Sequence, residues 1–81
     1  TDPEPLIRTE AAAALGQVTY LPSVPHLILA IQDSDLDVRK AAINSLGKIG
    51  DRSALDPLTA LLSDDQEVVR VLAKLAIAQI E

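Results

Sequence analysis

Apolar residues recur along the chain at the spacing of α-helices. In residues 36–49 they fall on one helical face, and residues 23–32 carry a second series with the same kind of spacing. The first face holds Val38, Ala42, Ser45, Leu46 and Ile49, and the second holds Val24, Leu27, Ile28 and Ile31. Together with the breaks between such segments, the pattern predicts five helices, near residues 4–18, 23–32, 36–49, 54–63 and 66–80.

Residues that begin or end helices stand between these segments. Gly50 and the proline-containing residues 21–25 predict turns. Ser34, followed three residues later by Asp37, resembles a capping box at the start of a helix. We expect Ser53 to cap a helix whose first turn holds Pro57, where the missing N–H costs no intrahelical bond.

The sequence repeats itself with a period of 31 residues. Acidic, basic and apolar positions all keep this register without a gap. The matching series are Asp2, Asp33 and Asp64; Arg8, Arg39 and Arg70; Ile7, Val38 and Val69; Ala11, Ala42 and Ala73; Leu15, Leu46 and Ile77; and Val18, Ile49 and Ile80. They divide one domain, residues 1–81, into units 2–32 and 33–63 and a half unit 64–81.

The stretch DSDLDVRKAAINSLGKIGD, residues 33–51, resembles a HEAT repeat. It is most similar to the short HEAT-like type of phycobilisome (phycocyanobilin) lyase subunits. The resemblance implies an all-α superhelix, a HEAT-like solenoid. It also implies a ladder between neighbouring repeats in which Asp33 pairs with Arg39 and Asp64 with Arg70. The alternative is that these arginines bind a ligand.

Composition and charge narrow the classes of partner. The chain has 81 residues, a net charge of −5, no cysteine and a single aromatic residue, Tyr20. Nucleic-acid binding is not expected, because phosphate recognition needs clustered Lys and Arg. No apolar run reaches the roughly 20 residues of a membrane span, and no signal peptide is recognisable. An intracellular, cytoplasmic protein is expected, and because the sequence begins without methionine we expect a processed or excised piece.

Few residues offer chemistry. Asp33, Asp35 and Asp37 have the opening spacing of a calcium loop, but Val38 occupies the place of the turn glycine. His26, the single histidine, has no nucleophile or carboxylate at a convincing spacing, so we expect a surface residue. Tyr20 is either a contact residue or a cover for the core. We therefore predict no catalytic residue, no metal, no cofactor and no enzyme.

A strip on the helices of the arginine series is the candidate binding groove. At 100° per residue its outward positions in the second and third units are Lys40, Ile43, Asn44, Val71, Lys74 and Leu75. The strip is small-sided and apolar, with Lys40, Lys48 and Lys74 as its charges. It predicts binding of another protein through a helical segment with apolar and acidic residues. The alternative is an ordinary helix surface.

The last helix, EVVRVLAKLAIAQI, is apolar on almost every side. Terminal repeats normally present a polar outer face. We therefore expect either a fragment of a longer array or a homodimer through this helix. The leading functional prediction is a non-catalytic scaffold that binds another protein in a concave groove. The alternative is part of a bilin lyase or of a factor that handles phycobiliproteins, and a purely structural spacer stays open.

Overall fold

The computed structural model describes residues 4–17 and 24–81, with the backbone alone for residues 15–17. Its helices are α1 (Pro5–Gln17), α2 (Val24–Ala30), α3 (Leu36–Ile49), α4 (Leu55–Ala60) and α5 (Glu67–Ile80); the 3-10 turns η2 (Arg52–Ala54) and η3 (Leu61–Ser63) flank α4. The described residues contain no strand, and none of their helices is long and apolar enough to cross a membrane. The predicted all-α fold with five helices is confirmed.

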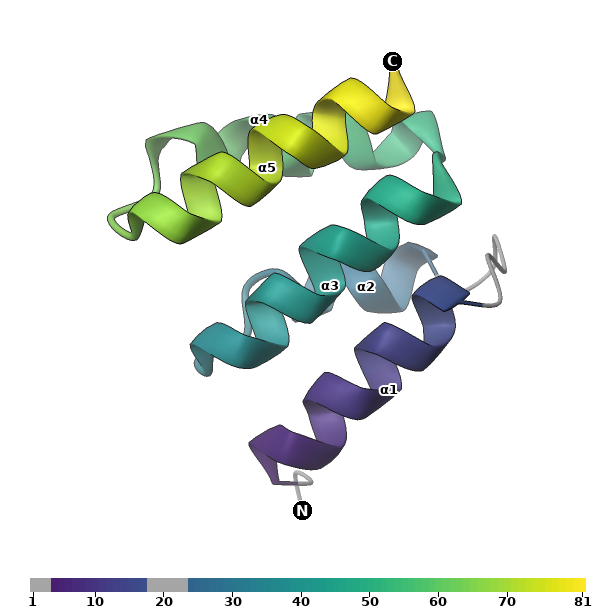
Figure 1. Cartoon of the computed structure of the whole chain (residues 1–81), viewed down its shortest axis with the longest axis vertical. Coiled ribbons are helices and arrows are strands. Elements are labelled where there is room, and N and C mark those ends of the chain that lie inside the picture. The colour runs from purple at the N-terminus through teal and green to yellow at the C-terminus, as the bar shows by residue number, and fades with distance from the viewer. Residues whose placement is uncertain (1–3, 18–23) are drawn as a thin grey trace.

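The helices form two layers (Figure 1). Helices α1, α3 and α5 lie side by side in the front layer, with α3 in the middle, and α2 and α4 lie behind them. The molecule is a slab with extents of 34 × 29 × 15 Å. Each helix of the back layer is followed along the chain by the front-layer helix on which it packs, so α2–α3 and α4–α5 are the two helical hairpins.

Helix α3 forms the centre of the core. Its residues Val38, Ala42 and Leu46 are buried, together with Leu27 of α2 and Leu58 of α4. Since α1 and α5 pack on its two sides and α2 packs behind it, α3 is covered on three sides. Burial of one Val, Leu or Ile side chain contributes about 1.5–3 kcal/mol, so this helix carries much of the hydrophobic stabilisation.

The ends of α3 are fixed by Asp35 and Gly50. The carboxylate of Asp35 accepts a hydrogen bond of 3.2 Å from the backbone N–H of Val38. Gly50 adopts a left-handed conformation at φ 78°, and its N–H donates to the Leu46 carbonyl. The prediction that Ser34 caps this helix is wrong, because Asp35 directly precedes the first helical residue and its carboxylate accepts more strongly than a hydroxyl.

The start of α4 also differs from the prediction. The turn η2 directly precedes α4 in the chain. Asp51 is the residue before η2, and its carboxylate accepts a 2.8 Å hydrogen bond from the backbone N–H of Ser53. Ser53 is therefore a donor within the turn and not the cap of α4, whose preceding residue Ala54 makes no side-chain cap. Pro57 does lie in the first turn of α4.

Candidate functional site

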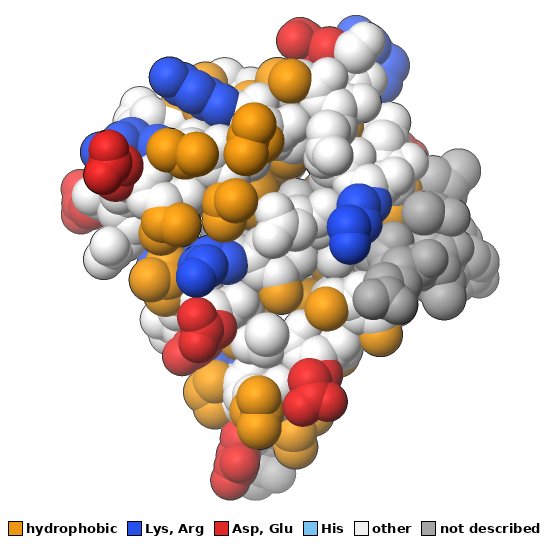
Figure 2. Space-filling model, viewed as in Figure 1, with side chains coloured by type: hydrophobic (Ala, Val, Ile, Leu, Met, Phe, Trp, Pro, Cys, Tyr) orange, Lys and Arg blue, Asp and Glu red, His pale blue; other side chains and the backbone are white. Residues whose placement is uncertain are grey.

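Three large apolar side chains lie exposed along α5. Val68, Val71 and Leu75 are 37, 49 and 58% exposed. Because they are spaced three and four residues apart, they share one side of the helix, and we call them the α5 stripe. Figure 2 shows hydrophobic side chains gathered over α5 on the face formed by the front layer, with basic side chains beside them.

The corresponding positions of α3, 31 residues earlier, are polar. They hold Asp37, Lys40 and Asn44, of which Asp37 and Asn44 are exposed and Lys40 is half-buried. Lys40 Nζ lies 3.9 Å from the Asp37 carboxylate, a loose surface pair. An apolar stripe on this face is therefore a property of α5 and not of every helix in the layer.

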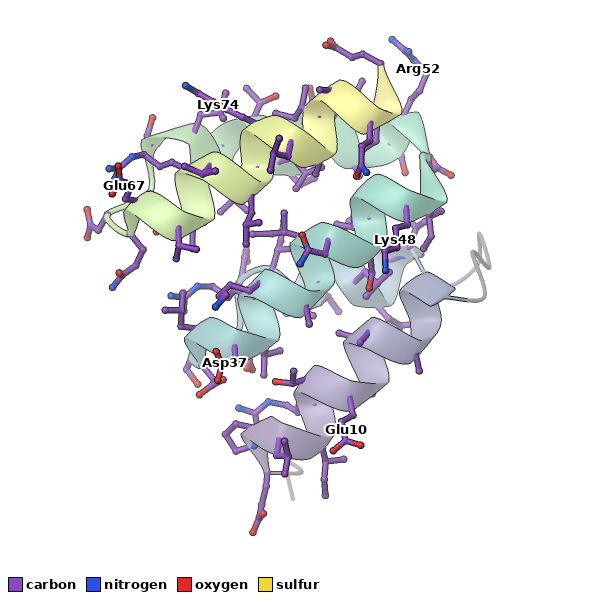
Figure 3. The ribbon with its side chains drawn as sticks, in the orientation of Figure 1. Glu10, Asp37, Lys48, Arg52, Glu67 and Lys74 are labelled. Atoms are coloured by element: carbon purple, nitrogen blue, oxygen red, sulfur yellow. The ribbon has the colours of Figure 1, made fainter. Side chains whose placement is uncertain are left out.

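Basic groups adjoin the α5 stripe. Lys74 lies on the outer side of α5, away from α3 (Figure 3). With Arg70, Val71, Glu67 and Leu62 it lines a hollow of about 320 Å³. Arg70 is held there because its Nη1 donates to the carbonyls of Asp64 and Asp65, at 2.6 and 3.2 Å. An apolar side chain and an acidic group could thus be bound together at this end of the stripe.

Of the six residues predicted to line a groove, Ile43 is placed wrongly. Asn44, Val71, Lys74 and Leu75 are exposed and Lys40 is half-buried, whereas Ile43 is fully buried. Ile43 lies on the side of α3 that faces α5. Lys74 occupies the matching position of α5, and within the described residues no helix lies beyond it. A single-helix projection could not predict this difference, because it depends on the neighbouring helix.

The predicted ladder, in which the Asp33 carboxylate pairs with Arg39 and the Asp64 carboxylate with Arg70, is not formed. Arg39 Nη1 donates to the main-chain carbonyl of Asp33 at 2.8 Å, and Arg70 binds the Asp64 carbonyl in the same way. The carboxylate of Asp33 instead accepts from Arg8 Nε, at 2.8 and 3.1 Å. Each arginine therefore fastens the loop before its own helix, and Arg8 joins α1 to the loop of the next hairpin.

The corresponding contact between Arg39 and Asp64 is not formed. The Asp64 carboxylate accepts from the backbone N–H of Gln66 at 2.9 Å. Arg39 Nε is buried and has no hydrogen-bond partner among the described residues. The two side chains line a hollow of about 360 Å³, and no side-chain ion pair between described residues joins the second and third units there, whereas Arg8 and Asp33 join the first and second.

The other candidate residues are dispersed. Asp33 pairs with Arg8, Asp35 caps α3 and Asp37 lies near Lys40. No group of three or more His, Cys, Asp or Glu side chains within residues 4–17 and 24–81 is placed to hold a metal ion. His26 is exposed on α2, and Tyr20 lies outside the described residues.

Known proteins with similar sequences include bilin lyase subunits. The chain is 46% identical over 61 residues to "Bilin biosynthesis protein PecE" of Mastigocladus laminosus, covering 74% of this chain and 23% of the relative. It is 42% identical over 57 residues to "Phycocyanobilin lyase subunit alpha" of a Picosynechococcus species, covering 70% and 21%. The predicted resemblance to phycobilisome lyase repeats is confirmed.

A second group of relatives corrects the prediction that the chain is no enzyme. Over 85 residues the chain is 36% identical to "Deoxyhypusine hydroxylase" of Aspergillus clavatus, covering 99% of this chain and 25% of the relative. Lyases and hydroxylases are enzymes, so a non-catalytic assignment made from the absence of a catalytic motif is contradicted. In these comparisons the chain spans about a quarter of the relative's length, and so short a segment need not contain the residues that react.

The family assignment rests on the repeat as a whole. The helices are paired in two layers, and Arg39 and Arg70 each bind the loop before their own helix in the same way. The sequence family described as HEAT repeats matches residues 1–78. The chain therefore belongs to the HEAT-repeat family.

Proposed function

We propose that this chain is the protein-binding segment of a longer HEAT-repeat protein, and that the α5 stripe receives an amphipathic helix of the partner. The observation that carries the proposal is the exposed series Val68, Val71 and Leu75. Amphipathic helices present their apolar anchors at this spacing, so a partner helix with the same pattern can pack along the stripe by interdigitation of side chains. The length of the relatives leaves room for other segments of the whole protein to perform its chemistry.

The charges beside the stripe define the partner further. Lys74 and Arg70 flank it on the outer side, and Lys40 stands on α3 at the position that matches Val71 of the stripe. A partner helix with two or three apolar residues on one face and Asp or Glu at its borders fits this arrangement. The apolar residues supply the affinity, whereas the border charges mainly set orientation and association rate.

Selection of binders from a library of helical peptides tests the proposal directly. We expect peptides selected on the 81-residue chain to carry Leu, Ile or Phe at i, i+3 or i+4 with acidic neighbours. Changing Val71 and Leu75 together to Asp should weaken their binding at least about tenfold, which corresponds to 1.4 kcal/mol. Peptides without this pattern, or with unchanged affinity for the variant, would contradict the proposal.

The charge component has its own matched control. Lys40→Glu and Lys74→Glu should each weaken the selected peptides and reduce the salt dependence of their association. Lys48→Glu makes the same charge change near the C-terminal end of α3, away from the stripe (Figure 3). Equal effects of all three changes would show that net charge, and not the site, controls binding.

Handling of a bilin is a second candidate function, and the names of the lyase-type relatives favour it. Under this proposal the apolar face would lie against the tetrapyrrole and the lysines would pair with its propionates. Absorbance titration of the chain with a bilin tests it. A red-shifted spectrum that Val71→Asp and Leu75→Asp abolish would support bilin binding, whereas an unchanged spectrum would count against it.

A further inference from the structure

Two charges of opposite sign flank the α5 stripe. Glu67 stands in the first turn of α5 and Lys74 stands seven residues later. Both side chains are exposed and line the same hollow of about 320 Å³ (Figure 3). No ion pair among the described residues involves either of them. Because seven residues make almost two full turns, the two side chains share one side of the helix and are separated by about 10 Å along its axis.

The neighbouring charges strengthen this polarity. Asp65, in the loop before α5, is exposed, and it too has no ion pair with a described residue. Arg70 stands between Glu67 and Lys74, but it is half-buried and its Nη1 is held by two backbone carbonyls of the preceding loop. A partner therefore meets negative charge where the stripe begins and positive charge halfway along α5.

A partner helix has a charge order of its own. The partial positive charge at a helix N-terminus favours Asp and Glu in the first turn, and the partial negative charge at the C-terminus favours Lys and Arg in the last turn. An amphipathic helix with this order can match both Glu67 and Lys74 in one direction only. Its basic C-terminal half must lie beside Glu67, and its acidic N-terminal half must lie beside Lys74.

We propose that the α5 stripe binds its partner helix antiparallel to α5, and that the partner carries an acidic residue two helical turns before a basic one, beside its apolar face. The inference rests on the proposed function, because it specifies the direction and the charge order of the helix that the stripe receives. Apolar contacts are non-directional, so the two charges are what distinguishes one direction from the other.

Two peptides of identical composition test the charge order. Both carry the same leucines on one face, and they differ only in the exchange of one Glu and one Lys placed two turns apart beside these leucines. A hydrocarbon staple on the opposite face keeps both peptides helical, so that charge order does not act through helicity. We expect the peptide with Glu first to bind about three to ten times more tightly at low salt, the effect of two exposed ion pairs. The difference should shrink at high salt.

A nitroxide label at the N-terminus of the Glu-first peptide measures the direction. In the antiparallel complex the label lies near the end of α5. It should therefore broaden the backbone amide signals of Gln79 and Ile80 more than those of Val68 and Val69. The opposite result would place the peptide parallel to α5.

A charge exchange within the protein identifies the two residues responsible. Glu67→Lys combined with Lys74→Glu keeps both the net charge and the stripe, and it should abolish or invert the preference between the peptides. Asp56→Lys combined with Lys48→Glu is the matched control. Asp56 also lies in the first turn of a helix, α4, and this exchange away from the stripe should leave the preference unchanged.

The possible results separate this inference from the proposed function. If Val71→Asp with Leu75→Asp weakens both peptides, but they bind with equal affinity or parallel to α5, the direction is wrong and the stripe remains the site. If neither peptide binds, or if that double change leaves binding unaffected, the proposed function fails and the direction fails with it. Tighter, antiparallel binding of the Glu-first peptide, reversed or abolished by the charge exchange, supports both.

Discussion

Gly47 of α3 lies directly against Ala76 of α5. A methyl group built on Gly47 would lie 3.1 Å from the Cα of Ala76 and 3.2 Å from its Cβ. Glycine at this position therefore serves the close approach of two helices and not a special backbone conformation. Glycine lowers helix propensity, but at position 47 its small size allows α3 to pack closely against Ala76 of α5.

Gly47→Leu should separate α3 from α5. We expect a loss of about 1–3 kcal/mol in the free energy of unfolding, the usual cost of overpacking. Urea denaturation measures it. Ala78→Leu is the matched control, because residue 78 stands 31 positions later and is exposed; it should change the stability by less than about 0.5 kcal/mol. Similar losses for both would contradict the close contact.

Arg8 and Asp33 should be energetically coupled. Their side chains are 24 and 13% exposed and join α1 to the α2–α3 loop. A double-mutant cycle with Arg8→Gln and Asp33→Asn should give a coupling of about 1 kcal/mol. The exposed pair Lys40–Asp37, treated in the same way, should give roughly 0.3 kcal/mol. Equal coupling energies for the two pairs would show that the Arg8–Asp33 contact does not fasten α1.

Asp51 should make stability depend on acid pH. The backbone N–H and the hydroxyl of Ser53 donate hydrogen bonds that lower the pKa of the Asp51 carboxyl below 3.8. The folded-state pKa of Asp51 lies below its unfolded-state pKa, which is about 3.9. The ionised carboxylate therefore contributes its full stabilisation of the folded state at pH values above the unfolded-state pKa. It is lost as the pH falls through the folded pKa. Asp51→Asn should therefore show a smaller decline of stability below pH 4, and NMR titration of Asp51 measures the shift directly.

Self-association through α5 is a further prediction. The α5 stripe leaves Leu75 more than half exposed, and pairing of two stripes would remove it from water. We expect sedimentation equilibrium to detect a concentration-dependent dimer that Leu75→Asp weakens. Leu29→Asp, an equally drastic change at a more exposed leucine of α2, should leave the dimer intact. A monomer at every concentration would contradict the prediction.

The periodic pattern predicted α3 well because its apolar residues form one complete face, which is buried. The bounds of α3, residues 36–49, agree with the prediction, and α5 starts one residue later than expected. The helix starts were less predictable. Residues Ser34 and Asp35 are both good caps, and the sequence does not decide between two adjacent starts; in the structure the helix begins at Leu36, directly after Asp35.

The candidate site was predicted from single helices, and the errors come from pairs of helices. A helical projection separates inward from outward positions, which suffices for Asn44 and Leu75. It does not separate positions that face solvent from those that face a neighbouring helix in the same layer, as Ile43 does. The matching Ala12 of α1 is buried as well, whereas the matching Lys74 of α5 is exposed, so the environment of this position depends on the presence of a neighbouring helix.

The two seams of α3 have different mechanical properties. On one side the hydroxyl of Ser45 donates a buried 2.6 Å hydrogen bond to the Ala12 carbonyl, and such a bond weakens steeply when its geometry changes. On the other side Gly47 packs against Ala76, with the Gln79 side chain beside them, and no side-chain hydrogen bond between described residues joins α3 to α5. Small sliding of packed helices is a recognised mode of motion. Under a bending load, α1 and α3 should therefore move as one stiff plate, while α5 and its hairpin slip against it and absorb the curvature.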